Sequence, residues 1–142
     1  MNEEFQIGVV TAVQFSLFED FLSSKTIKDF KADEPTVILG ISVDEKACGA
    51  IAGTMESDDL FVIDSFYVHP EVRRNGGGSL LLDTLMEQLH DNDEGIAAKL
   101  FFTEDSDDTE CLYDFLIARG ETESSFNDTD KGLVEHRFVI ID

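Results

Sequence analysis

A glycine-rich segment between an apolar run and a helical pattern constrains this chain more than any other feature. The segment Arg-Arg-Asn-Gly-Gly-Gly-Ser occupies residues 73–79, after the apolar run Leu60–Val68 and before a helical pattern that begins near Leu80. The N-terminus of a helix offers unpaired N–H groups and about half a positive charge, and glycines let a phosphate approach the backbone. This order of strand, turn and helix predicts a phosphate-binding turn, at which Arg73 and Arg74 supply permanent positive charge.

Two common phosphate loops do not fit these residues. A nucleotide P-loop needs Gly-Lys followed by Ser or Thr, and the dinucleotide fingerprint needs Gly or Ala where Leu81 stands. The pattern Arg-x-x-Gly-x-Gly does fit, as Arg73, Gly76 and Gly78, and Val-His-Pro-Glu precedes it at residues 68–71. Together these motifs resemble the acyl-CoA signature of the GNAT superfamily of N-acetyltransferases. The simpler alternative is a flexible glycine turn without a ligand.

The order of the expected elements agrees with this resemblance. Hydrophobic periodicity and turn residues predict strands at residues 5–10, 36–43, 47–55, 60–68, 96–103 and 133–141, and helices at 13–22, 80–89 and 110–119. The partner of the last strand is expected near residues 121–126. The order is similar to the GNAT fold over essentially the whole chain. It implies an α/β (α+β) fold with a mixed central sheet of about seven strands flanked by helices.

Size and composition indicate one domain without a membrane span. The chain has 142 residues, of which 42% are hydrophobic, so we expect a single domain over residues 1–142. No stretch approaches ~18 uncharged apolar residues, and the acidic start Met1–Glu4 is unlike a basic signal peptide. We therefore expect a cytoplasmic protein with no membrane partner. Cys48 and Cys111 have neither a metal-ligand nor a redox spacing and are interpreted as reduced core thiols.

The charge of the chain restricts its partners. There are 31 acidic and 10 basic residues, for a net charge of −21. Nucleic acid is excluded as a partner because its phosphates need a basic surface. Such a field attracts a cationic substrate, although acidity that only confers solubility is the simpler interpretation. The field also repels CoA, so local cations are needed to hold it.

The resemblance implies a set of residues that bind acetyl-CoA as a co-substrate. The main chain of Phe66, Tyr67 and Val68 would contact the acetyl group and the pantetheine arm, and the Val68 N–H would stabilise the oxyanion. As side chains, Phe66 and Val68 are expected to belong to the core. The pyrophosphate would be held by the N–H groups of Arg73, Arg74, Asn75, Gly76, Gly77, Gly78 and Ser79.

Asp64 is the candidate general base. A lysine-like amine has a pKa near ~10.4, so only about one molecule in a few thousand is neutral at pH 7 and the site needs a base. Asp64 lies in an otherwise apolar strand, and the sequence Asp-Ser-Phe-Tyr-Val that begins there resembles polyamine-type GNAT acetyltransferases. Strand alternation predicts that Asp64, Phe66 and Val68 share one face, where apolar neighbours raise the carboxyl pKa. A solvent-facing Asp64 is the alternative, and Glu56 or Asp58 could act through water.

The acid that protonates the leaving thiolate is less well matched. Many GNAT members carry a tyrosine four residues before the glycine that ends the last helix, but here Leu116 precedes Gly120 at that distance. Tyr113 lies one turn earlier, about 5 Å along the axis, and is the candidate acid. Packing against the preceding helix is its alternative. The usual Gly-Phe is Gly120-Glu121, and Thr109 replaces a common Asn, so the second half of the site resembles the family poorly.

The leading hypothesis is an N-acetyltransferase that acts on an unidentified small amine. The negative charge of the protein favours a cationic amine. The alternatives are a non-catalytic acyl-CoA-binding domain, in which Leu116→Tyr would restore activity, and an interaction domain that keeps only the fold. A homodimer through the last strands is common in the family and stays open. The acidic segment at residues 104–110 lacks the glycine and register of a calcium loop, so no metal is expected.

Overall fold

The computed structural model describes residues 5–32, 36–57, 60–73, 76–92, 97–103, 107–121, 123–128 and 134–140. Its strands are β1 (Phe5–Val9), β2 (Val37–Val43), β3 (Lys46–Ser57), β4 (Leu60–Val68), β5 (Ala97–Thr103), β6 (Glu123–Asp128) and β7 (Val134–Ile140). Its helices are α1 (Phe15–Phe18), the 3-10 helix η1 (Glu19–Phe21), α2 (Ser24–Lys31), α3 (Pro70–Arg73), α4 (Gly77–Asn92) and α5 (Asp107–Ala118). No helix within these ranges is long and apolar enough to cross a membrane.

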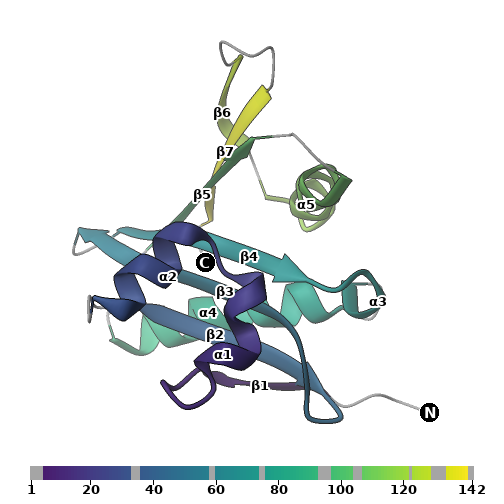
Figure 1. The fold of residues 1–142 in the computed structure, drawn as a ribbon. Coiled ribbons are helices and arrows are strands. Elements are labelled where there is room, and N and C mark those ends of the chain that lie inside the picture. Colours follow the sequence, from purple (N-terminus) through teal and green to yellow (C-terminus); the bar gives the residue numbers. More distant parts are fainter. Residues whose placement is uncertain are drawn as a thin grey trace.

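The described strands form one mixed sheet of seven strands in the order β1-β2-β3-β4-β5-β7-β6. Neighbouring strands are antiparallel except for β4 and β5, which run parallel. Figure 1 shows two parts of this sheet, a broad part formed by β1 to β4 and a part formed by β5, β7 and β6 that rises away from it. The predicted α/β fold with a mixed sheet flanked by helices is confirmed.

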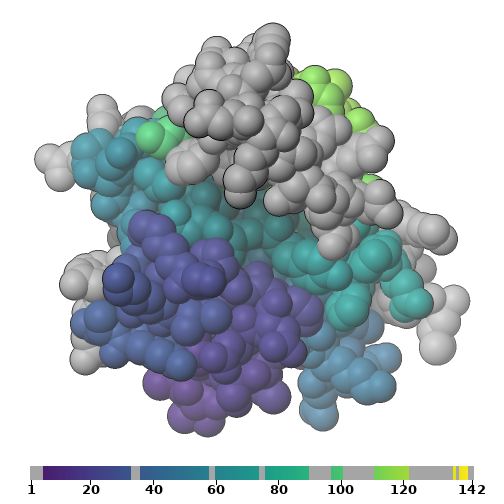
Figure 2. Space-filling model, turned by 45° about the horizontal axis from the view of Figure 1, so that its top comes forward, coloured from purple at the N-terminus to yellow at the C-terminus, as the bar shows by residue number. Residues whose placement is uncertain are grey.

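Helices cover both faces of the broad part of the sheet. The helix α4 lies behind the sheet in Figure 1, whereas α1 and α2 lie in front of it. Behind the sheet, the buried α4 residues Leu81, Leu82, Leu85, Met86 and Leu89 pack on inward residues of β2, β3 and β4. In front of it, Phe15, Phe18 and Leu22 pack on Ile38, Ala50 and Ala52. In Figure 2 the purple and blue surface of residues 5–32 adjoins the teal surface of residues 60–73.

A bulge interrupts β4 at Asp64. Ser65 pairs with Ala52 and Ile63 pairs with Gly53, so Asp64 is an extra residue without a partner on β3. On its other edge β4 pairs with β5 only as far as Ile63. Beyond this point the two parallel strands separate, as Figure 1 shows, and no described strand pairs with the end of β4 on this edge.

The first helical segment differs from the prediction of one helix at residues 13–22. The chain forms α1 and η1, and the side chains of Val13 and Leu17 are 90% and 63% exposed. The helical run ends because Leu22 is extended, and Ser23 then caps a second helix, α2, by accepting a hydrogen bond from the Thr26 N–H. Ser23 is a recognisable N-cap residue in the sequence, but the prediction of a helix at residues 13–22 was based on the apolar spacing before it.

Candidate functional site

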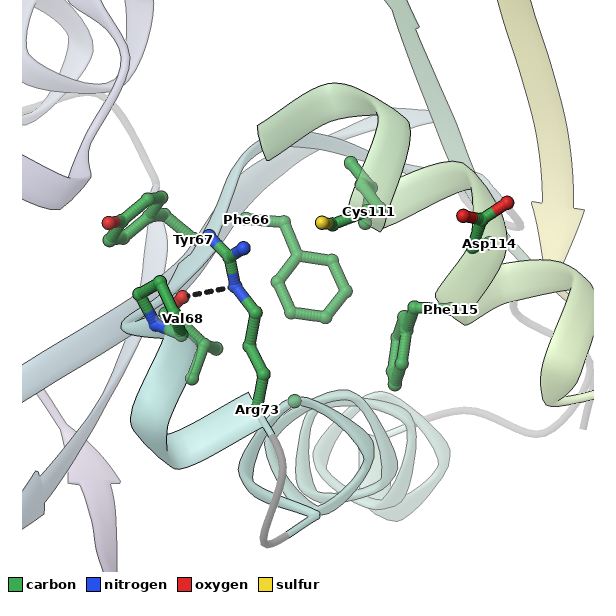
Figure 3. A pocket seen from close by; sticks show the side chains of 10 residues that line it. Phe66, Tyr67, Val68, Arg73, Cys111, Asp114 and Phe115 are labelled. Atoms are coloured by element: carbon green, nitrogen blue, oxygen red, sulfur yellow. Dashed lines mark hydrogen bonds between the residues drawn. The ribbon is translucent and has the colours of Figure 1, made fainter. Parts of the chain in front are cut away.

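A pocket of about 620 Å³ lies between the end of β4 and α5. Its wall is formed by Phe66, Tyr67, Val68, Pro70, Arg73, Gly78, Cys111, Leu112, Asp114 and Phe115. Figure 3 shows Phe66 of β4 and Phe115 of α5 facing each other across the pocket. Their rings meet edge to face at 5.9 Å between centroids. The wall is therefore largely apolar, with polar groups supplied by β4, Arg73 and α5.

The open edge of β4 brings main-chain groups into this pocket. The His69 N–H donates to the Cys48 carbonyl on β3 at 2.8 Å, so alternation directs the main-chain groups of Phe66 and Val68 away from β3. Among the described residues, no strand pairs with β4 on that side beyond Ile63. The N–H groups of Phe66 and Val68 are thus positioned to donate to a ligand that lies along the strand edge.

The glycine turn closes one end of the pocket at the start of α4. Gly76 has φ = 84°, a left-handed conformation that favours glycine, and α4 begins at Gly77. The Leu80 N–H donates to the Gly76 carbonyl at 3.0 Å, which is the first hydrogen bond of the helix. The N–H groups of Gly77, Gly78 and Ser79 precede this bond and so belong to the first turn of the helix, whose N–H groups have no partner within the helix and can bind anions.

Arg73 spans from the turn back to the end of β4. Its Nε donates to the Val68 carbonyl at 2.5 Å, and its guanidinium lies 5.2 Å from the centre of the Tyr67 ring. Figure 3 shows this side chain extending toward Val68 and Tyr67. A permanent cation therefore stands between the glycine turn and the open strand edge. Arg74 and Asn75, which were predicted to join it, lie outside the described residues.

Arg119 joins the end of α5 to the first turns of α4. Its guanidinium donates to the Ser79 hydroxyl and, at 2.7 Å, to a carboxylate oxygen of Asp83. It also lies 5.8 Å from the centre of the Phe115 ring. Because Phe115 contacts the place where a Cβ on Gly78 would lie, these interactions hold the pocket wall of α5 against the glycine turn.

Asp64 lies on the α2 side of the sheet, with a side chain that is 9% exposed. Its Oδ2 accepts a hydrogen bond from Lys25 Nζ at 3.3 Å, whereas Phe66 and Val68 pack with the α4 core on the opposite face. The prediction of one shared face is wrong, because the bulge places Asp64 and Ser65 on the same side and reverses the alternation. Among the described residues, Asp64 does not form part of the pocket wall.

Burial raises the pKa of the Asp64 carboxyl above its ordinary value, and the nearby Lys25 ammonium offsets part of this rise. This direction agrees with the expectation for a carboxylate in an apolar strand. Of the alternatives, Glu56 pairs with Lys99 at 3.2 Å on the exposed end of β3, and Asp58 lies outside the described residues.

Neither Tyr113, the candidate acid, nor Leu116, at the usual tyrosine position, lines the pocket. The Tyr113 ring packs against β7, 4.4 Å from the His136 ring and 6.0 Å from the Phe138 ring between centroids. Leu116 is fully buried in the main core. The structure therefore favours packing as the role of Tyr113, with β7 and not the preceding helix as its neighbour.

The pocket wall of α5 was missed by the sequence analysis. Cys111 and Phe115 are one turn apart on the helix, and Leu112 and Asp114 complete this side. Their spacing was a usable signal, but nothing in the sequence shows which side of a helix meets β4. Cys111 is exposed and lines the pocket, so its interpretation as a core thiol is wrong.

The family model described as the Acetyltransferase (GNAT) family matches residues 7–113 of the chain. A search of curated proteins found no match to the chain. The match to the family model begins within β1 and covers the strands β2 to β5, the glycine turn and the first half of α5.

Solved structures resemble this fold at low sequence identity. A GNAT-family protein from Desulfovibrio desulfuricans has a TM-score of 0.77 and 11% identity, covering 97% of this chain and 99% of that chain. An aminoglycoside 6'-N-acetyltransferase complexed with coenzyme A has a TM-score of 0.75 and 12% identity, over 94% and 95%. The ribosomal-protein-S18-alanine N-acetyltransferase from Escherichia coli has a TM-score of 0.69 and 15% identity, over 96% and 93%. At these low sequence identities the structural resemblance shows the fold alone.

Proposed function

The chain belongs to the GNAT family of acetyltransferases, and on this premise we propose that it transfers an acetyl group from acetyl-CoA to the amine of a small molecule. One observation carries the proposal: a single pocket joins the open edge of β4 to the glycine turn at the start of α4. This pocket offers strand N–H groups at one end and unsatisfied helix N–H groups, with Arg73, at the other. A thioester with a diphosphate tail needs both kinds of donor.

In the proposed binding mode, the first-turn N–H groups of α4 hold the pyrophosphate. These groups belong to Gly77, Gly78 and Ser79, and Arg73 leaves the Val68 carbonyl to pair with a phosphate oxygen. Arg74, Asn75 and Gly76 complete the set that the motif predicts. The Phe66 and Tyr67 main chain contacts the pantetheine arm and the acetyl group, and the Val68 N–H stabilises the oxyanion.

In the proposed reaction, the Asp64 carboxylate accepts a proton from the amine through a water molecule, since Asp64 does not line the pocket. This proton comes from the ammonium form of the substrate, so a neutral amine nitrogen then bonds to the carbonyl carbon. The carbon–sulfur bond breaks, the nitrogen releases its second proton to solvent, and the thiolate of CoA takes a proton from solvent. Solvent fills this role in the proposal because Tyr113 packs on β7.

We further propose that the amine is cationic, that the reaction takes place in the cytoplasm and that residues 1–142 form one domain. The net charge of −21 supports a cationic acceptor, because the field of the protein concentrates such molecules near its surface. The same field repels CoA, which is a polyanion, so its binding depends on local donors. In the proposal these donors are Arg73 and the N–H groups at the start of α4.

A non-catalytic acyl-CoA-binding domain is the second candidate. It is favoured by the positions of two α5 side chains: Leu116 is fully buried and Tyr113 packs against β7, so neither supplies an acid to the pocket. This candidate keeps the glycine turn and the strand edge and predicts binding without turnover.

Melting curves with and without acetyl-CoA test the pocket, and release of CoA with a panel of amines tests the reaction. A ligand that binds only the folded state stabilises it by about 2.7 kcal/mol at a hundredfold excess over its dissociation constant. We expect this shift for the natural chain and its loss in Arg73→Glu. Lys46→Glu, which makes the same change of charge at the exposed first residue of β3, is the control and should keep the shift.

A shift with amine-dependent release of CoA supports the acetyltransferase, and a shift without release for any amine supports the binding domain. No shift at millimolar acetyl-CoA, or an equal shift in Arg73→Glu, would contradict the assignment of the pocket.

A further inference from the structure

The N-terminus of α2 is fixed to the bulge of β4 by three hydroxyl groups. The Ser23 N–H donates to Ser65 Oγ at 2.8 Å, and the hydroxyls of Thr26 and Ser65 are 2.8 Å apart. The Ser23 hydroxyl lies 3.1 Å from that of Thr26 and caps the helix. Thr26 is fully buried and Ser65 is 5% exposed. A buried network with satisfied partners defines one arrangement of its groups, so α2 has a fixed position beside the bulge.

This network places Lys25 beside Asp64, since each is the immediate chain neighbour of a network residue. Lys25 Nζ lies 2.8 Å from Asp29 Oδ2 and 3.3 Å from Asp64 Oδ2. Asp29 is one turn further along α2, so the same helix supplies the cation and a second carboxylate that directs it. The ammonium thus bridges α2 to the strand that lines the pocket.

The burial of Asp64 makes the ionisation of its carboxyl group depend on the Lys25 cation. Its side chain is largely buried, and burial disfavours a carboxylate unless a nearby cation compensates. The charged groups that face it from the described parts of α2 are Lys25 and Asp29, and its β3 neighbours are Ala52 and Gly53. On β5, Lys99 lies beside Val62 and pairs with Glu56. Among these groups Lys25 is the one that stabilises the charged form of Asp64, whereas Asp29 opposes it.

We propose that Lys25 is a positioning residue of this site: its ammonium group holds the Asp64 carboxylate ionised and oriented to accept the proton of the amine. The inference rests on the proposed function, in which Asp64 is the base. It adds a contribution from α2 that neither the glycine turn nor the strand edge provides. The hydroxyl network gives the pair its geometry, and Asp29 keeps the ammonium directed at the bulge.

The sign of the pH effect follows from the charges. A general base acts when ionised, so the rate falls at low pH as Asp64 is protonated. Removal of the Lys25 cation raises the pKa of Asp64 further, since the burial that disfavours the carboxylate remains. The acidic limb of the pH–rate profile therefore moves to higher pH, and the loss of rate is larger at the acidic end of the profile than on its plateau.

The test compares Lys25→Met, Lys25→Arg and the control Lys28→Met, an exposed lysine on the same helix. The pH profile of kcat/KM is measured for each, and the Asp64 carboxyl carbon is titrated by NMR in the free protein, with Asp64→Asn identifying its signal. We expect Lys25→Met to move both the acidic limb and the Asp64 titration upward. Lys25→Arg should restore both, and Lys28→Met should leave both unchanged. The melting shift with acetyl-CoA should be the same in the natural chain and in the Lys25→Met, Lys25→Arg and Lys28→Met variants.

An Asp64 titration that stays in place in Lys25→Met would overturn the proposal, and so would an equal shift in Lys28→Met. The titration needs no turnover, so it decides the role of Lys25 even if no amine is acetylated. In that case the absence of CoA release counts against the proposed function alone. Asp64→Asn with full activity would overturn the assignment of the base and the positioning role with it.

Discussion

Gly76, Gly77 and Gly78 are adjacent in the sequence but meet different surroundings in the fold. Gly76 has φ = 84° and open space where a Cβ would lie. A Cβ on Gly77 would overlap the Val72 side chain and lie 3.0 Å from the Val72 carbonyl oxygen. A Cβ on Gly78 would lie 3.5 Å from the Phe115 ring, which is an ordinary contact. The motif gave all three the same role, yet only the structure distinguishes backbone conformation, packing and access to the pocket.

Because their surroundings differ, substitutions of Gly77 and Gly78 should affect the stability of the protein and the binding of acetyl-CoA differently. Gly77→Ala should lower the free energy of unfolding by about 1–3 kcal/mol, because Val72 is buried and cannot move aside easily. Gly78→Ala should leave this free energy unchanged or raise it by about 0.5–1 kcal/mol, because alanine favours a helix. Its methyl group would narrow the approach to the helix N–H groups and weaken acetyl-CoA binding. Denaturant titration and the acetyl-CoA melting shift measure the two effects. Unchanged binding in Gly78→Ala would contradict the proposed phosphate site.

At the scale of elements, α5 meets the fold with two different sides. Leu116 is buried in the main core, while Cys111 and Phe115 line the pocket. The family pattern aligned Leu116 with a catalytic tyrosine, and under the hypothesis of a non-catalytic acyl-CoA-binding domain Leu116→Tyr was expected to restore activity. In the structure this position has no exposed surface, so a tyrosine there would put its hydroxyl group into the core.

Leu116→Tyr should therefore destabilise the protein without restoring transfer. The larger ring overpacks the core, and we expect a loss of about 1–3 kcal/mol in the free energy of unfolding. Ile117→Tyr, on the next residue and 46% exposed, is the matched control and should change stability by less than about 0.5 kcal/mol. Denaturant titration of both variants measures this. A stable Leu116→Tyr protein with new activity would show that the side chain reaches the pocket.

The strands and helices were predicted to different extents. The prediction of strands at 36–43, 47–55 and 60–68 is confirmed by β2, β3 and β4. The turn between β2 and β3 also agrees, with positive φ at Asp44 and Glu45 as a tight hairpin requires. These elements have strong local patterns. The bulge at Asp64 has no such pattern, because it depends on how β3 pairs with β4.

At the scale of the whole molecule, the net charge of −21 acts on every part of the chain. Like charges repel one another more in the compact folded state than in the expanded chain, so this charge lowers the stability of the fold. Salt screens the repulsion, because the Debye length falls from about 30 Å at 0.01 M to about 8 Å at 0.15 M ionic strength.

The melting temperature should therefore rise with sodium chloride over this range. The double variant Asp20→Asn, Glu87→Gln removes two exposed charges and should show a smaller rise. Calorimetry at a series of salt concentrations measures both proteins. A melting temperature that falls with salt in the natural chain would mean that specific ion pairs, such as Lys25–Asp64 and Arg119–Asp83, outweigh the general repulsion.

The sequence by itself determined the glycine turn, the order of the strands and the family, because each depends on residues close together in the chain. Tertiary structure alone decided where β4 leaves β5, on which face Asp64 lies and which side of α5 forms the pocket. These features arise from pairing and packing between distant segments, for which a local pattern carries no information. The glycine turn proposed to bind phosphate could therefore be identified by motif, whereas the groups placed around Asp64 could be found only in the folded chain.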